Sequence, residues 1–72
     1  MPDYPVLSGA EIVRALERLG FAQVRQRGSH VVLRRGAQGC VVPLHREVKR
    51  GTLRGVVRQA EITPEELLAA LS

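Results

Sequence analysis

The same helix-start signal occurs near both ends of this chain, and it limits what the stretch between can form. In each copy a hydroxyl residue is followed three positions later by glutamate: Ser8 with Glu11, and Thr63 with Glu66. Such a capping box pairs backbone amides that the first turn of a helix leaves without partners. We therefore expect one helix to begin after Ser8 and another after Thr63, with Pro64 at its first position.

The first helix is expected to end at Gly20, and two strands follow it. Residues 21–27 and 30–35 are strand-like, and the short Gly28-Ser29 segment between them favours a hairpin. Side chains alternate between the two faces of a strand. The second strand therefore turns Val31 and Leu33 toward a core, and it places His30, Val32 and Arg34 on the opposite face.

The rest of the chain adds a strand, a loop and a helix. A turn at 36–39 leads into a short third strand at 40–42, which Pro43 should end or leave at an edge. Residues 44–51 are polar and basic without a period, which indicates a loop. Thr52 is the expected N-cap of a second helix, and the apolar residues of that helix recur at helical spacing: Leu53, Val56, Val57 and Ala60.

These elements predict a small α+β domain of order α-β-β-β-α-α, with helices on one face of a three-stranded antiparallel sheet. With 72 residues the chain can build one core, so we expect a single domain over residues 1–72. Cys40 is the only cysteine, which excludes an internal disulfide. Neither a signal sequence nor a long apolar run is apparent, so we expect a cytoplasmic protein with no membrane contact.

Positive charge is concentrated in the middle of the chain. Residues 1–24 carry two arginines against three acids, for −1, and residues 59–72 carry three glutamates, for −3. Residues 25–58 hold nine Lys and Arg against Glu47 alone, for +8. This segment suits a polyanion such as nucleic acid, although a solvated basic surface is the alternative. Two aromatic residues are too few to stack bases, so phosphate and ribose contacts should dominate.

One histidine directly follows the expected tight turn. His30 comes after Gly28-Ser29, close to Arg25 and Arg27. A neutral imidazole can take a proton from a ribose 2′-hydroxyl while guanidinium groups stabilise the charge that develops on the phosphate. On the residues alone, a surface histidine is the other interpretation. His45 could be a second acid-base group, but a structural role is favoured because nothing fixes its distance from His30.

Two further groups of residues are candidates for a site. His30, Cys40 and His45 lack the paired spacing of zinc ligands, so we expect no metal, and Cys40 is expected to pack in the core or at an edge. Lys49, Arg50 and Thr52 stand at an expected helix start, where free amides and the helix dipole favour a phosphate. The same residues could simply begin the helix.

Taken together, the motifs resemble those of the HicA toxin family. They are Arg25-Gln26-Arg27-Gly28-Ser29-His30, Pro43-Leu44-His45 and Lys49-Arg50-Gly51-Thr52-Leu53, in this order and spacing. The resemblance implies a fold similar to a double-stranded-RNA-binding domain and cleavage of mRNA without a metal or other cofactor. It also implies neutralisation by a HicB-like antitoxin.

By position, the resemblance assigns catalysis to His30, with Gly28 and Ser29 shaping its turn, and it matches His45 to a family histidine. We expect RNA to contact Arg25, Arg27, Gly28, Ser29, Lys49, Arg50 and Thr52. The toxin alone is expected to be a monomer. An acidic antitoxin surface over these cations would compete with RNA phosphates. The alternatives are a non-catalytic RNA-binding module and an adaptor that docks an acidic protein on the same face.

Overall fold

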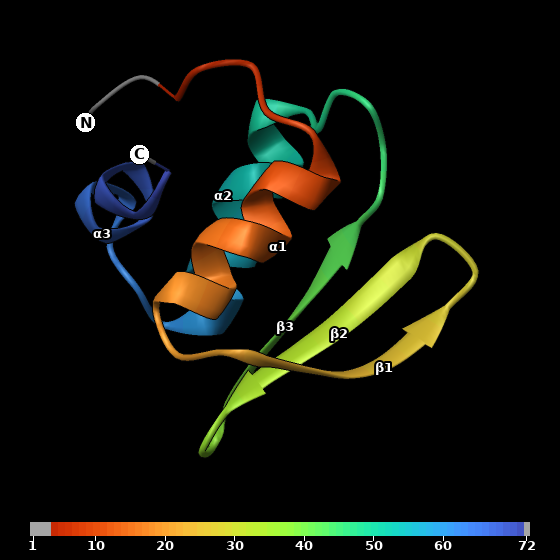
Figure 1. Ribbon diagram of the computed structural model, residues 1–72. Coiled ribbons are helices and arrows are strands. Elements are labelled where there is room, and N and C mark those ends of the chain that lie inside the picture. The colour runs from red at the N-terminus through yellow and green to blue at the C-terminus, as the bar shows by residue number, and fades with distance from the viewer. Residues whose placement is uncertain (1–3, 72) are drawn as a thin grey trace.

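The computed structural model describes residues 4–71, which form one helix, three strands and two further helices (Figure 1). This order confirms the α+β fold expected from the sequence. The elements are α1 (Gly9–Arg18), β1 (Ala22–Arg27), β2 (His30–Arg35), β3 (Gln38–Pro43), α2 (Arg50–Ala60) and α3 (Pro64–Ala70).

The sheet is antiparallel throughout, with β2 between β1 and β3. Its register pairs Arg27 with His30 and His30 with Pro43, and β1 bulges between Gln23 and Arg25. Figure 1 shows α1 and α2 on the same side of the sheet. α3 packs against α1 instead of against the strands. The helices thus leave the second face of the sheet open.

The core lies between the sheet and the helices. Val31 and Leu33 of β2 are almost fully buried, at 1% and 0% exposure, which confirms the expected alternation. Burying one such side chain stabilises a fold by about 1.5–3 kcal/mol. The other large side chains that are fully buried come from the three helices and β3: Ile12, Leu16, Val42, Leu53 and Leu67.

Both predicted capping boxes are present. The Ser8 hydroxyl accepts from the backbone amide of Glu11 at 3.1 Å, and the Glu11 carboxylate accepts from the amide of Ser8 at 2.9 Å. These bonds lower the pKa of Glu11. Thr63 and Glu66 form the same pair of bonds at the start of α3.

Two predicted boundaries were wrong. α2 begins at Arg50, with Lys49 as its N-cap, so Thr52 lies inside the first turn and does not cap the helix. The preceding residue explains the shift: buried Val48 donates its amide to the carbonyl of Leu7 at 2.8 Å, which fixes the chain just before α2. β3 is longer than expected because the turn before it is shorter. That turn contains only Gly36 and Ala37 between the paired residues of β2 and β3.

Candidate functional site

The site is built on the turn between β1 and β2. Gly28 has a φ of 55°, which residues with a side chain rarely adopt, and Ser29 completes a two-residue connection. A positive φ at the first turn position suits the right-handed twist of the flanking strands. Gln26 adds a hydrogen bond from its side-chain nitrogen to the carbonyl of Gly28 at 3.0 Å. His30 therefore begins β2 immediately after a well-defined turn.

The sheet register brings the histidine and two arginines to one face. Arg27 lies directly across from His30, and Arg25 lies two residues farther along β1, paired with Val32. Directly paired side chains are about 4.5–5.5 Å apart at Cβ, and diagonal neighbours are about 7–8 Å apart. All three charged or titratable side chains are exposed, on the side opposite buried Val31. A phosphate placed over this row can therefore meet an imidazole and a guanidinium together.

Backbone hydrogen bonds with segment 43–45 hold the turn in place. The carbonyl of Ser29 accepts from the amide of Leu44 at 2.6 Å, and the amide of Gly9 donates to the carbonyl of His45 at 2.9 Å. A Cβ on Gly9 would collide with the carbonyl oxygen of Pro43 and lie 2.7 Å from the Cα of Leu44. Thus the first residue of α1 must be small for segment 43–45 to reach the turn.

Sequence reasoning did not find this role for Gly9. The residue stands between the members of a capping box, where several residue types are acceptable, so no local signal marks it. Only the packing of α1 against segment 43–45 shows why glycine is needed.

The structure gives His45 a fixed backbone and a free side chain. Its carbonyl is bound by Gly9, and it follows Pro43, the partner of His30 in the sheet, by two residues. The imidazole itself is exposed. His45 therefore lies on the segment that supports the turn, and its part in acid-base chemistry stays a prediction.

The cations at the start of α2 occupy a different hollow. Lys49 and Arg50 line a cavity of about 330 Å³ together with Tyr4 and Glu47, and none of the residues at 25–30 lines it. Thr52 is exposed in the first turn of α2, which has no side-chain cap. The structure thus groups Arg25, Arg27 and residues 28–30, and it does not place Lys49, Arg50 or Thr52 in that group.

Two other residues of the basic segment have structural roles. Arg35 donates to the carbonyl of Leu19 at 2.7 Å and to the side chain of Gln38 at 2.9 Å, and its guanidinium lies 4.7 Å from the centre of the Phe21 ring. Cys40 is buried in the core, as expected, and burial raises the pKa of its thiol to about 11. The thiol is therefore neutral at physiological pH and is a poor nucleophile.

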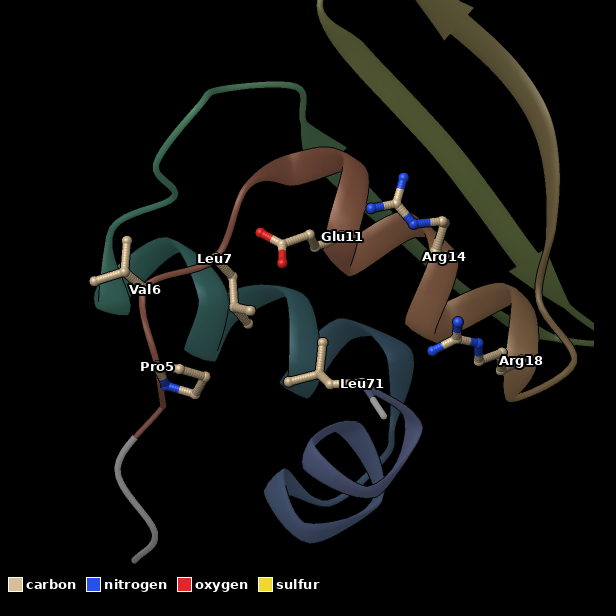
Figure 2. A pocket seen from close by; sticks show the side chains of 7 residues that line it. All are labelled: Pro5, Val6, Leu7, Glu11, Arg14, Arg18 and Leu71. Carbon is tan, nitrogen blue, oxygen red and sulfur yellow. The ribbon is translucent and has the colours of Figure 1, made fainter.

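A larger hollow lies elsewhere. A cavity of about 350 Å³ lies between the segment before α1, α1 itself and the end of the described chain. Figure 2 shows the side chains that line it. Its lining includes Glu11, Arg14, Arg18 and Leu71, and it shares no residue with the group around His30. Arg18 is engaged there, because it donates to the carbonyl of Ala70 at 2.7 Å. This hollow is thus partly a junction between α1 and α3.

Within residues 4–71, no cluster of three His, Cys, Asp or Glu side chains could hold a metal ion. No helix in the same part of the chain is long and apolar enough to cross a membrane.

Comparison with known proteins agrees with the motifs. A search among curated proteins finds no match. A family model described as the HicA toxin of bacterial toxin-antitoxin matches residues 9–62. The matched region runs from α1 through the three strands and α2, and it includes His30. Because the match covers most of the chain, the protein belongs to the HicA toxin family of bacterial toxin–antitoxin systems.

Proposed function

We propose that this toxin is an endoribonuclease that cuts mRNA and uses His30 as its general base. The observation that carries the proposal is the row formed by Arg27 and His30, directly paired and exposed beside a two-residue turn. Family membership supports a toxin role. A mRNA substrate implies that the toxin acts in the cytoplasm.

In the proposed reaction, the neutral His30 imidazole takes the proton of a ribose 2′-hydroxyl. The 2′-oxygen then attacks the adjacent phosphorus, the bond from phosphorus to the 5′-oxygen breaks, and the leaving oxygen receives a proton. The products carry a 2′,3′-cyclic phosphate and a 5′-hydroxyl. Arg27 and Arg25 stabilise the charge on the phosphoryl oxygens. No step of this sequence requires a metal ion or another cofactor.

One positioned base contributes about 10²- to 10⁴-fold to a rate. His45 is the candidate for protonating the leaving oxygen, since its backbone is held beside the turn that carries His30. If His45 is only structural, water supplies that proton and the enzyme is correspondingly slower.

RNA extends beyond the cleaved phosphate, and a second set of cations can hold it. Lys49, Arg50 and the first turn of α2, which no side chain caps, form a clamp for a phosphate farther along the strand. A HicB-like antitoxin with an acidic surface over Arg25, Arg27 and His30 would exclude RNA by direct competition. Both complexes should weaken as salt rises.

The test uses an RNA oligonucleotide and a copy in which 2′-deoxyribose replaces ribose at the mapped cleavage position. The parent should cut only the first, in the presence of EDTA, and leave a 2′,3′-cyclic phosphate that mass spectrometry detects. A His30→Ala preparation purified in parallel controls for contaminating nucleases. Cutting of the deoxy copy at an equal rate would exclude the proposed attack. Binding of both oligonucleotides without any cutting would instead indicate a non-catalytic RNA-binding module.

A further inference from the structure

The two edges of the sheet differ in how they are protected. On β3, the side chain of Gln59 from α2 accepts from the outward amide of Val41 at 3.3 Å. On β1 all six residues are exposed, and apart from the ladder with β2 no residue in 4–71 gives its backbone a hydrogen bond. An exposed edge of this kind can pair with another extended chain, and proteins usually cover or block it. The bulge between Gln23 and Arg25 interrupts this edge, and the regular stretch from Arg25 to Arg27 is open.

The two sides of β1 offer different surroundings. On the helix side, a groove of about 290 Å³ runs between α1 and β1. Its apolar lining is Ala10, Val13, Val31 and Leu44, and its polar lining is Arg14, Glu17, Gln23 and Gln26. On the open side, a hollow of about 300 Å³ is lined by Val24, Arg25, Val32 and Arg34. An added strand would thus meet a partly apolar groove on one side, and two arginines with two valines on the other.

We propose that β1 binds an extended acidic segment of a partner protein, which adds to the sheet as a fourth strand. Because successive side chains of a strand point to opposite faces, alternate residues of the segment would enter the groove and should be apolar. The intervening residues would lie over Arg25 and Arg27 and should be acidic. Within residues 4–71 neither guanidinium has a hydrogen-bond or ion-pair partner, so both are available to carboxylates.

Two other occupants fit less well. A second copy of this chain, paired through its own β1, would bring Arg25 and Arg27 against their equivalents, and like charges across strands are destabilising. RNA phosphates can accept from the outward amides of β1 but cannot donate to its outward carbonyls, and they leave the apolar part of the groove, Val13, Val31 and Leu44, uncovered. An acidic peptide can pair with the outward backbone groups of β1, place apolar side chains in the groove, and bring carboxylates to Arg25 and Arg27.

This docking does not require that His30 be catalytic. It does place the bound segment beside the row of Arg27 and His30, so the segment would compete with RNA for the same arginines. A partner that binds in this way could therefore regulate the site from its edge, without inserting a side chain over the histidine.

The probe is a synthetic peptide in which glutamate and valine alternate, titrated into the folded protein by calorimetry and by amide NMR. Two N-methylated versions carry the methyl groups on one or the other alternate set of residues. Strand addition uses the amides of only one set, so one version should lose binding and the other should keep it. The amide shifts should map to β1 and to the groove residues.

Charge is tested by Arg25→Glu, which should weaken peptide binding about tenfold or more. Arg58→Glu on exposed α2 is the matched control and should bind as the parent does. His30→Ala should also bind the peptide normally, so loss of cleavage and loss of docking are separable. The proposal is overturned if the parent does not bind the peptide, if both N-methylated versions bind equally, or if the shifts map away from β1. Dimerisation through β1 in place of peptide binding would equally overturn it.

Discussion

β2 has a two-residue turn at each end, and the two turns are locally alike but differ in use. Gly28 and Gly36 both adopt positive φ, 55° and 60°, with no atom near the position of a Cβ. The residue of β2 next to the first turn is His30, which is exposed and has no side-chain hydrogen bond to any residue in 4–71. Next to the second turn is Arg35, which binds Leu19, Gln38 and the Phe21 ring.

The difference lies in which atoms hold each turn in place. The first turn is fixed by backbone groups, through Ser29 and Leu44, with Gly9 supporting the segment that follows, and the side chain of Gln26 adds one hydrogen bond to Gly28. The second is fixed by a side chain, that of Arg35. This support leaves the side chain of His30 available to a substrate. At the second turn, the guanidinium of Arg35 is already engaged in hydrogen bonds that hold the turn. One cation of the +8 segment is thus part of the fold.

Substituting His30 should give the largest effect on function and almost none on stability. We expect His30→Ala to lower the rate of RNA cleavage about 10²- to 10⁴-fold, because it removes the proposed base. Its melting temperature should stay near that of the parent, since exposed substitutions usually change stability by less than about 0.5 kcal/mol. Single-turnover cleavage and thermal unfolding measure the two quantities. If the variant cleaved RNA as fast as the parent, the first turn would not differ from the second in function.

Breaking the backbone support of the first turn should affect both stability and cleavage. In Gly9→Ala the new Cβ meets the backbone of Pro43 and Leu44, so we expect a loss of about 3 kcal/mol in the free energy of unfolding. Cleavage per folded molecule should also fall, because segment 43–45 must shift. Gly55→Ala, inside α2 with only Arg58 Nη2 3.9 Å away, is the matched control and should stabilise by about 0.5–1 kcal/mol. Urea unfolding of the two variants measures both changes in the free energy of unfolding.

Removing the anchor of the second turn should affect stability alone. Arg35→Met keeps an apolar stem over Phe21 but loses the hydrogen bonds to Leu19 and Gln38, and we expect a loss of about 2 kcal/mol. Arg34→Met, on the open face beside it, should change stability by less than about 0.5 kcal/mol. If cleavage by the folded Arg35 variant dropped as far as that of the His30 variant, the two turns would not be functionally distinct.

The sequence predicted the fold well where the signal was local. Capping boxes at Ser8 and Thr63 placed two helices, and the alternation around Val31 and Leu33 placed the core face of β2, because these patterns depend on residues a few positions apart. The start of α2 was missed because it depends on Val48 pairing with Leu7, which is distant in the chain.

The same distinction applies to the site. The turn and its histidine were found because Gly28, Ser29 and His30 are consecutive. The support from Gly9 and the open edge of β1 were not found, since both arise only when distant segments pack together. The nine cations of the basic segment also could not be sorted from the sequence, because only tertiary contacts distinguish Arg35 from Arg27.

The smallest predicted effect separates turn geometry from function most cleanly. Gly28→Ala and Gly36→Ala each place a side chain at positive φ with nothing nearby to collide with, so both should lose about 1 kcal/mol of stability from backbone strain alone. Equal losses by urea unfolding would show that the two turns are equivalent as local structures. Only Gly28→Ala should also slow RNA cleavage, because it alters the turn that orients His30. Equal slowing by both would mean that the whole sheet, and not the first turn, positions the histidine.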